Sequence, residues 1–298
     1  MKPIAEMQGG LVLARPKVLD YVTLVKPELT LLSVGTTLIG YLLGASDHFR
    51  PLLFFYTFIG TALVGGGAGA LNQFIEREFD ALMRRTQDRP LPAGRTSPPA
   101  AMLFGIVLAV LGVAILSILV NLLTGFLACA TLATYLFLYT PLKRITPLST
   151  IVGAVPGALP PVMGWTAARN AIDGPAWGLF AVLFLWQMPH FLSLAWVYRK
   201  DYERAGYRML TVLDPEGTRT ALQMLFFSAG LIPASIILGW SSGLTPVFIL
   251  GTVSIGAAFT LTSVHFMRLR SNRAARQVFV ASILYLLAWM SFLVMGTR

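Results

Sequence analysis

Residues 100–139 read AAMLFGIVLAVLGVAILSILVNLLTGFLACATLATYLFLY and contain no charged side chain. An α-helix rises about 1.5 Å per residue, so about 20 apolar residues are enough to cross the hydrocarbon of a bilayer. The stretch is long enough for two crossings, and Asn121 interrupts it near the middle. It therefore predicts two membrane helices joined by a very tight turn at Asn121.

The rest of the chain repeats this pattern. Of its 298 residues, 56% are hydrophobic and 12% are charged, and the mean hydropathy of +0.71 excludes an ordinary soluble globule. We therefore predict an all-α integral membrane bundle of nine spans, with an N-terminal segment 1–27 before a single domain 28–298. The expected spans are 29–44, 52–71, 100–120, 122–139, 148–168, 175–198, 221–239, 246–266 and 278–295.

The basic residues predict the orientation of these spans. A net charge of +10 would suggest nucleic acid as the partner of a soluble protein, but here the charges are concentrated in alternate loops. With the N-terminus in the cytoplasm, twenty Lys and Arg residues lie inside and three lie outside, as the positive-inside rule requires. The C-terminus is then outside. We see no cleaved signal peptide or import presequence, which favours a bacterial plasma membrane over an organelle, and we expect no nucleic-acid partner.

Several apolar spans carry local signals. The lone Cys129 predicts a packed core thiol and no disulfide framework. Three prolines between positions 156 and 161, and Pro189 in a later span, predict kinks or breaks. Four glycines within 65–69 predict either close helix packing or a loosened helix that lines a cavity.

The first charged motif follows the second span and reads NQFIEREFD at 72–80. If the helix continues past Leu71, then Asn72, Glu76 and Asp80 are four residues apart and share one face. Two carboxylates and an amide oxygen form a hard-oxygen set that suits Mg²⁺ bound jointly with phosphate groups. The motif therefore predicts a metal and phosphate site.

The sequence MRRTQDRPL at 83–91 extends this motif with cations. Arg85 and Arg89 are again four residues apart, and guanidinium groups match the oxygens of a diphosphate, with Arg84 as a third candidate. The alternative is a solvated loop whose charges pair with one another. The density of acids at a helix end in an otherwise uncharged protein favours the site, because unpaired carboxylates are costly there.

A second charged motif, YRKDYERAGYRML at 198–210, follows the sixth span. Asp201 is its candidate metal ligand, and Arg199, Lys200 and Arg204 are its candidate diphosphate partners. The segment alone is equally consistent with a solvated loop. Because it lies four spans after the first motif, it predicts a pseudo-repeat with a site between two halves.

His190 lies inside the sixth span, in WQMPHF at 186–191. A lone membrane histidine is usually a hydrogen-bonded core residue, but ionisable groups at membrane depth are also functional candidates. Its imidazole suits a metal ion or a tetrapyrrole carboxylate. We keep His190 as a candidate haem-binding residue, with the core role as the alternative.

These motifs resemble a known family. The pattern of Asn72, Glu76 and Asp80, followed by Arg85, Arg89 and PL, is similar to the first motif of the UbiA superfamily of intramembrane aromatic prenyltransferases. Four further segments resemble its branch of protohaem IX farnesyltransferases, and the resemblance runs from about Lys26 to the C-terminus. These segments are WQMPHF at 186–191, 198–210, YTPLKR at 139–144 and VPGALPP at 155–161.

The resemblance implies a nine-helix bundle around a central cavity, with farnesyl diphosphate as donor, Mg²⁺ as cofactor and haem b as acceptor. The implied product is haem O, the precursor of haem A for terminal oxidases, with a haem A synthase as a further partner. Two departures are visible. Glu76 stands where many members have aspartate, and Val197 stands where the second motif often has another aspartate, four residues before Asp201.

Two other functions remain open. A quinone-pathway prenyltransferase of the same fold would take a small aromatic acid, but the segments 189–191 and 205–210 favour haem. A transporter of anionic lipids or metabolites would also use basic loops and kinked helices. It would not need a paired carboxylate set.

Overall fold

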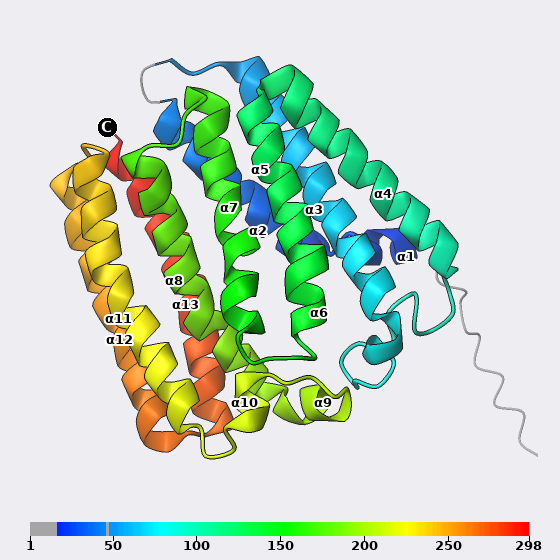
Figure 1. Cartoon of the computed structure of the whole chain (residues 1–298). Coiled ribbons are helices and arrows are strands. Elements are labelled where there is room, and N and C mark those ends of the chain that lie inside the picture. Colours follow the sequence, from blue (N-terminus) through cyan, green and yellow to red (C-terminus); the bar gives the residue numbers. More distant parts are fainter. Residues whose placement is uncertain (1–16, 46–47, 298) are drawn as a thin grey trace, which may run out of the picture.

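The structure is a computed structural model that describes residues 17–45 and 48–297 (Figure 1). Within these ranges the chain is helical and has no strand. Most of the predicted N-terminal segment 1–27 lies outside the described residues. The helices are α1 (Lys17–Leu24), α2 (Pro27–Gly44), α3 (Pro51–Asp80), α4 (Pro98–Ile115), α5 (Leu122–Ala133), α6 (Thr140–Leu142), α7 (Ser149–Arg169), α8 (Gly174–Val197), α9 (Arg199–Arg204), α10 (Leu210–Leu213), α11 (Thr218–Ser241), α12 (Pro246–Leu269) and α13 (Asn272–Gly296).

The long helices match the predicted spans. Eight helical segments are long and apolar enough to cross a membrane, and α1 with α2, bent by 46° at their junction, makes a ninth. Two spans include π-helical turns: Leu116–Val120 continues α4, and Thr134–Tyr139 joins α5 to α6. Large apolar side chains such as Ile118 and Leu122 are 78% and 79% exposed, as a lipid-facing surface requires. The nine-span all-α fold is confirmed.

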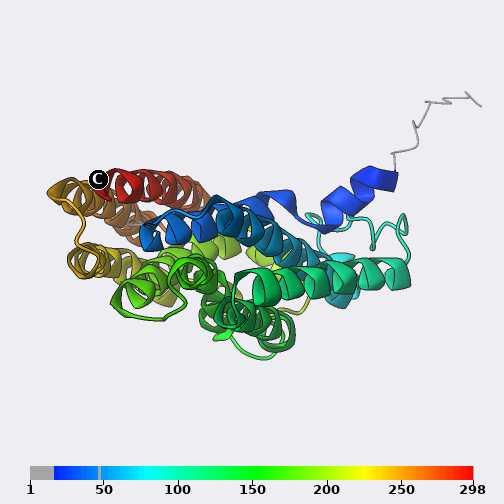
Figure 2. The ribbon, with the colours of Figure 1, turned by 90° about the horizontal axis from the view of Figure 1, so that it is seen from above.

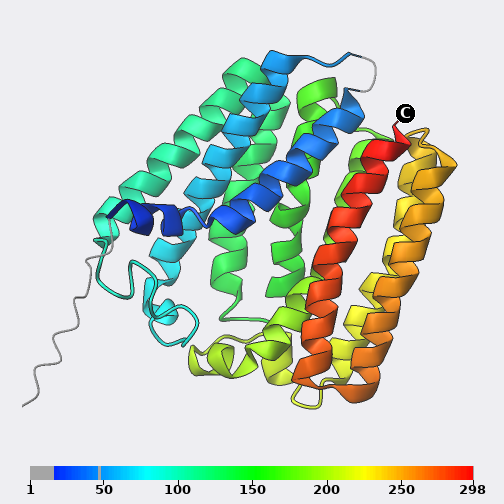
Figure 3. The ribbon, with the colours of Figure 1, turned by 180° about the vertical axis from the view of Figure 1, so that it is seen from behind.

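The helices form one elongated bundle. Seen from above in Figure 2, α11, α12 and α13 lie at one end and α4 lies at the other, with α2, α7 and α8 between them. Figure 3 shows the short helix α1 at an angle to α2, at the edge of the bundle where it contacts α3. The tight turn at Asn121 is also confirmed, because its side-chain oxygen accepts a hydrogen bond from the backbone N–H of Thr124 (2.8 Å) and so caps α5.

Glycines set the closest helix contacts. A Cβ atom at Gly67 of α3 would stand 2.7 Å from the backbone nitrogen of Ala109 in α4. A Cβ atom at Gly164 of α7 would overlap the carbonyl oxygen of Thr37 in α2. Small residues let membrane helices approach to this distance. Of the two interpretations of the glycines at 65–69, close packing is therefore the one that the structure supports at Gly67.

Two sequence predictions are wrong. Of the kinks or breaks predicted at the prolines of 156–161 and at Pro189, the breaks are wrong, since α7 and α8 continue through these residues. Neighbouring helices support such prolines, and α7 packs against α2, α5 and α8. Cys129 is exposed rather than packed, because it lies on the outward face of α5 with Leu122 and Phe126.

The charged loops come together at one end of the bundle, where α3 and α8 finish (Figure 1). A small apolar cluster joins them: Met83 from the first loop packs with Ala205, Tyr207 and Met209 from the second, and Phe79 of α3 borders it. The fold thus brings together two motifs that are far apart in the sequence.

Candidate active site

The last turns of α3 form the centre of the site. The helix continues nine residues past Leu71 and ends at Asp80. Asn72, Glu76 and Asp80 are only 1%, 6% and 1% exposed. The side-chain nitrogen of Asn72 donates a hydrogen bond to Glu76 Oε2 (3.0 Å). The three residues therefore share one buried face, as their spacing predicted.

Two lysines reach this face. Lys26, between α1 and α2, donates from Nζ to Asn72 Oδ1 (2.6 Å), and Lys143, just after α6, donates from Nζ to Glu76 Oε1 (2.7 Å). Burial disfavours the charged form of Lys143, but the Glu76 carboxylate outweighs it and holds the pKa of Lys143 well above its usual value. Lys143 thus carries positive charge directly to a predicted ligand oxygen, and Lys26 donates a hydrogen bond to another.

Two hydroxyl groups complete the surroundings. Tyr207, from the second loop, donates to Glu76 Oε1 (3.3 Å), and Thr140 accepts from the Asn72 side-chain nitrogen (3.2 Å). Burial and the nearby Glu76 carboxylate raise the pKa of the Tyr207 hydroxyl, which keeps it protonated as a donor. Four segments distant in the sequence therefore meet at the end of α3.

Four residues of the site were not predicted from the sequence: Lys26, Thr140, Lys143 and Tyr207. Tyr207 lies in the second charged motif at 198–210, and Thr140 and Lys143 lie in the segment 139–144, which was quoted only for its resemblance to a family. The available signal was a basic or hydroxyl side chain beside an already suspected motif. Nothing in the local sequence says which loop reaches α3.

Asp80 and Arg89 form the outer part of the site. Arg89 donates from one guanidinium nitrogen to Asp80 Oδ2 (2.7 Å), and Thr86 donates from its hydroxyl to the Asp80 backbone carbonyl (2.8 Å). These bonds fold the loop after α3 back over the helix end. The second carboxylate oxygen, Asp80 Oδ1, is buried without a hydrogen-bond partner. An unpartnered buried anionic oxygen is costly unless a cation or donor joins it.

Arg85 connects the first loop to the second. Its guanidinium group donates to the Tyr202 hydroxyl (3.3 Å) and lies 4.9 Å from the centre of the Tyr198 ring. Tyr202 also lies against Tyr207, with ring centres 5.9 Å apart. Arg85 is therefore connected through Tyr202 to Tyr207, the residue that reaches Glu76.

The acid of the second motif is differently placed. Asp201 accepts a hydrogen bond from Arg204 (3.2 Å), one turn later in the short helix α9. Within residues 17–45 and 48–297, no three His, Cys, Asp or Glu side chains converge on one metal position. The structure thus clusters Asn72, Glu76 and Asp80 more closely with lysines and Arg89 than with Asp201.

The remaining predicted cations differ in their surroundings. Arg199 lies over the Trp196 ring, 4.2 Å from its centre, and its NH1 atom is buried without a partner. Arg84 and Lys200 are exposed. Arg199 therefore has an unused donor in the second loop. Among the described residues, no hydrogen bond or ion pair fixes the orientation of the Arg84 and Lys200 side chains.

His190 lies in the seam between α8 and α13. Its ring stacks between Trp186 and Phe279, with ring centres 5.0 and 4.8 Å away, and its Nδ1 is 2.7 Å from the Ser282 hydroxyl. The Ser282 hydroxyl also lies 2.5 Å from the Phe279 carbonyl, and a hydroxyl that donates to this carbonyl accepts from Nδ1–H. This tautomer leaves Nε2 with a lone pair.

The arrangement favours one kind of chemistry. A carboxylate pair and an amide oxygen, surrounded by lysine and arginine, match a divalent cation shared with a substrate's phosphates. Mg²⁺ is typically held by one or two carboxylates, with phosphates and water completing its shell. The free Asp80 Oδ1 and the cation-balanced Glu76 fit such an ion.

Sequence comparison places the chain in a family. Residues 33–293 match the model of the UbiA prenyltransferase family. The chain is 44% identical, over 267 residues, to a protein of Salinibacter ruber named protoheme IX farnesyltransferase, covering 90% of this chain and 94% of that one. The mitochondrial protoheme IX farnesyltransferase of Arabidopsis thaliana is 40% identical over 92% of this chain and 64% of its own length.

Solved structures share the fold. A digeranylgeranylglyceryl phosphate synthase superposes with a TM-score of 0.79 at 16% identity, covering 95% of this chain and 99% of that one. A UbiA homologue from Archaeoglobus fulgidus, bound to GPP and Mg²⁺, gives 0.68 at 16% identity over 92% and 99%. The family model, which spans most of the sequence, and the relatives at 40–44% identity show that the chain belongs to the UbiA prenyltransferase family.

Proposed function

We propose that this protein transfers the farnesyl group of farnesyl diphosphate to a vinyl group of haem b, which yields haem O for haem A and terminal oxidase assembly. The observation that carries the proposal is the buried row of Asn72, Glu76 and Asp80 beside Arg89, in a chain 44% identical to proteins named protoheme IX farnesyltransferase. Haem and farnesyl diphosphate are both apolar molecules with charged ends, which suits a membrane bundle with a charged site at one end.

The diphosphate belongs at the end of α3 in this proposal. Asn72, Glu76 and Asp80 would hold Mg²⁺, with Asp201 as a further ligand, and the bound Mg²⁺ would stabilise negative charge on the leaving diphosphate. The Archaeoglobus fulgidus homologue, bound to GPP and Mg²⁺, supports this assignment. Arg85 and Arg89 supply guanidinium groups for the diphosphate oxygens.

Further cations extend this diphosphate site. Lys143 carries an ammonium group to the same buried face, Lys26 adds a second amine donor there, and Arg199 has a buried free donor in the second loop. Arg84, Lys200 and Arg204 complete the proposed cation set and line the solvent side of the two loops. When the C–O bond breaks, the diphosphate keeps the bonding electron pair and gains one negative charge. Fixed positive charge beside it stabilises this added charge.

The reaction is an ionisation followed by an addition. The allylic C–O bond breaks and its electron pair leaves with the diphosphate, while the vinyl group of haem b attacks the farnesyl carbon. Water adds to the resulting cation at the carbon attached to the porphyrin and loses a proton, giving the hydroxyethylfarnesyl group. The protein must exclude water until the new C–C bond has formed, and the apolar bundle serves that purpose.

We place His190 at the haem. The tautomer with Nδ1–H leaves a lone pair on Nε2, which suits a metal such as haem iron and does not suit a propionate carboxylate, since both would be acceptors. Stacking between Trp186 and Phe279 fixes the plane of the ring. The geometry thus favours iron ligation over propionate binding.

The location follows from charge. Twenty of the 23 Lys and Arg residues fall on the side of the active-site loops, so this side is proposed to be cytoplasmic in a bacterial plasma membrane. The N-terminus, in segment 1–27, lies on that side, and the C-terminus of the domain 28–298 lies on the other. A haem A synthase is the expected downstream partner, since it consumes the product.

The test is expression of the chain in cells that lack haem O synthesis, followed by pigment extraction and mass measurement. The expected result is a pigment heavier than haem b by one farnesyl group and one hydroxyl group. A prenylated aromatic acid would instead establish the quinone-pathway alternative. Transport without any prenylated product would establish the transporter.

A further inference from the structure

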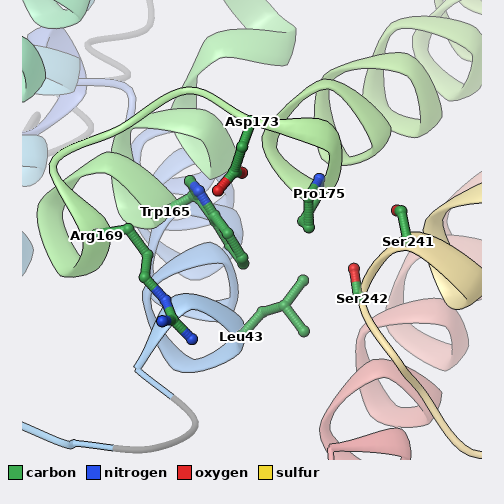
Figure 4. Close-up of a pocket in the computed structure, with 7 residues that line it drawn as sticks. All are labelled: Leu43, Trp165, Arg169, Asp173, Pro175, Ser241 and Ser242. Atoms are coloured by element: carbon green, nitrogen blue, oxygen red, sulfur yellow. The ribbon is translucent and has the colours of Figure 1, made fainter.

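A pocket lies at the opposite end of the bundle from the candidate active site (Figure 4). Its volume is about 330 Å³, and it is formed where α2, α7 and α11 end and α8 begins. The residues used below are Leu43, Trp165, Arg169, Asp173, Ser241 and Ser242. Figure 4 shows Trp165, Arg169 and Asp173 on one side and the two serines on the other.

Two polar atoms of this pocket lack partners within the protein. Trp165 is only 5% exposed, and its indole Nε1 is buried without a hydrogen bond. Across the pocket, Ser242 Oγ is also buried and unpartnered. An indole N–H can only donate, and a hydroxyl can donate as well as accept. The pocket wall therefore contains two polar groups on opposite sides, an N–H donor and a hydroxyl, whose hydrogen bonds no described residue satisfies.

The pocket also carries both signs of charge. The Arg169 guanidinium lies 5.7 Å from the centre of the Trp165 ring, and Asp173 belongs to the same turn between α7 and α8. A simple anion would use the donors and the arginine but would be repelled by the carboxylate. A ligand with a phosphate and a primary ammonium group uses all of them.

The position of the pocket specifies the source of such a ligand. Trp177, near the start of α8, and Trp240, near the end of α11, are 61% and 73% exposed beside it. Exposed tryptophans mark the level of the lipid headgroups in membrane proteins. The apolar side chain of Leu43, 5% exposed, forms part of the wall. The pocket is thus at headgroup depth, with an apolar surface for the upper part of an acyl chain.

We infer that this pocket binds the headgroup of a zwitterionic phospholipid, phosphatidylethanolamine. Its phosphate accepts from Trp165 Nε1, Ser242 Oγ and the Arg169 guanidinium, and its ammonium group donates to the Asp173 carboxylate. Phosphatidylglycerol has no cation for Asp173, and phosphatidylcholine has no N–H to donate. The site is independent of the proposed transferase chemistry and of its residues.

The test uses the full-length protein in detergent, titrated with phosphatidylethanolamine, phosphatidylglycerol or phosphatidylcholine, with bound lipid counted by native mass spectrometry. We expect phosphatidylethanolamine to bind about tenfold more tightly than the other two, which is the scale of one lost charged hydrogen bond. Trp165→Phe should weaken all three lipids. Asp173→Asn should remove only the preference for phosphatidylethanolamine.

Trp177→Phe is the matched control, because Trp177 is at the same end of the bundle but does not line the pocket. Thermal unfolding midpoints without lipid, and haem O formation, show whether each variant folds. Equal binding of the three lipids, or equal losses in Trp165→Phe and Trp177→Phe, would overturn the inference. So would displacement by inorganic phosphate or phosphoethanolamine at the same concentration as the lipid, which would identify a site for soluble anions.

Discussion

Lys143 Nζ lies 2.7 Å from Glu76 Oε1, and the two side chains are only 12% and 8% exposed. The pair joins the segment after α6 to the end of α3, in the middle of the proposed metal site. Burying two charges is costly, and their attraction compensates only if both stay charged and close. Lys143 therefore supplies positive charge to an oxygen that a metal ion would otherwise neutralise.

Removing this lysine should destabilise the protein. In Lys143→Met the Glu76 carboxylate loses its buried partner, and we expect the free energy of unfolding to fall by roughly 3 kcal/mol in the presence of a chelator. Added Mg²⁺ should recover part of the lost stability, because it binds the Glu76 carboxylate that Lys143 no longer pairs. Thermal or denaturant unfolding of the purified protein, with and without Mg²⁺, measures both effects.

Two variants control this experiment. Glu76→Gln combined with Lys143→Met removes both charges and should be more stable than Lys143→Met alone, whereas Lys17→Met removes an exposed lysine and should change little. A Lys143→Met protein as stable as the wild type would contradict the importance of the pair.

The same pair predicts a pH dependence. The folded pKa of Lys143 is raised, so its contribution to stability is complete below the usual lysine value and is lost only as the pH rises through the higher folded value. The difference in stability between wild type and Lys143→Met should therefore stay constant from neutral pH to about 9. A difference that shrinks over this range would mean that the pKa of Lys143 is lowered, not raised, in the folded protein.

Asp80→Asn tests the carboxylate of the first motif. The change keeps the shape and the contact with Arg89 but removes the negative charge, so haem O formation should fall by at least about 100-fold while the protein still inserts into the membrane. Product is measured by pigment extraction, and insertion by the amount of folded protein in membranes. The exposed Asp88→Asn is the matched control and should retain activity.

Arg85→Ala tests the connection between the two loops. Its guanidinium donates to the Tyr202 hydroxyl and lies over the Tyr198 ring. The variant should lose haem O formation, because it removes both a proposed diphosphate partner and the contact between the two loops. Tyr202→Phe removes only the hydroxyl and should cost much less. Arg77→Ala, whose partner Glu78 is beside it on α3, should leave the activity intact. An active Arg85→Ala enzyme would exclude Arg85 from the site.

The fold and the first half of the site could be predicted from the sequence for a simple reason. Apolar length and basic loops are local properties, and the spacing of Asn72, Glu76 and Asp80 has meaning as soon as the helix is known to continue. Arg89 follows within ten residues of Asp80, and the structure pairs them.

The second half could not be predicted because it depends on long-range packing. Lys26, Lys143 and Tyr207 reach α3 from three different segments, and no local pattern specifies that convergence. The prediction that Cys129 is packed in the core failed for a different reason. The composition of an apolar span does not indicate which of its faces meets lipid, and Cys129 is on the exposed face.

His190 gives the last prediction. If Nε2 ligates haem iron, His190→Gln should weaken haem b binding and shift its Soret band, while binding of farnesyl diphosphate stays unchanged. Ser282→Ala removes the acceptor that holds Nδ1–H, so it should give a smaller loss of haem binding by freeing the tautomer and the ring. Ser254→Ala removes an exposed hydroxyl that bonds only within α12 and serves as the control. A His190→Gln protein that binds haem with the wild-type spectrum would leave the histidine as a hydrogen-bonded residue of the α8 and α13 seam.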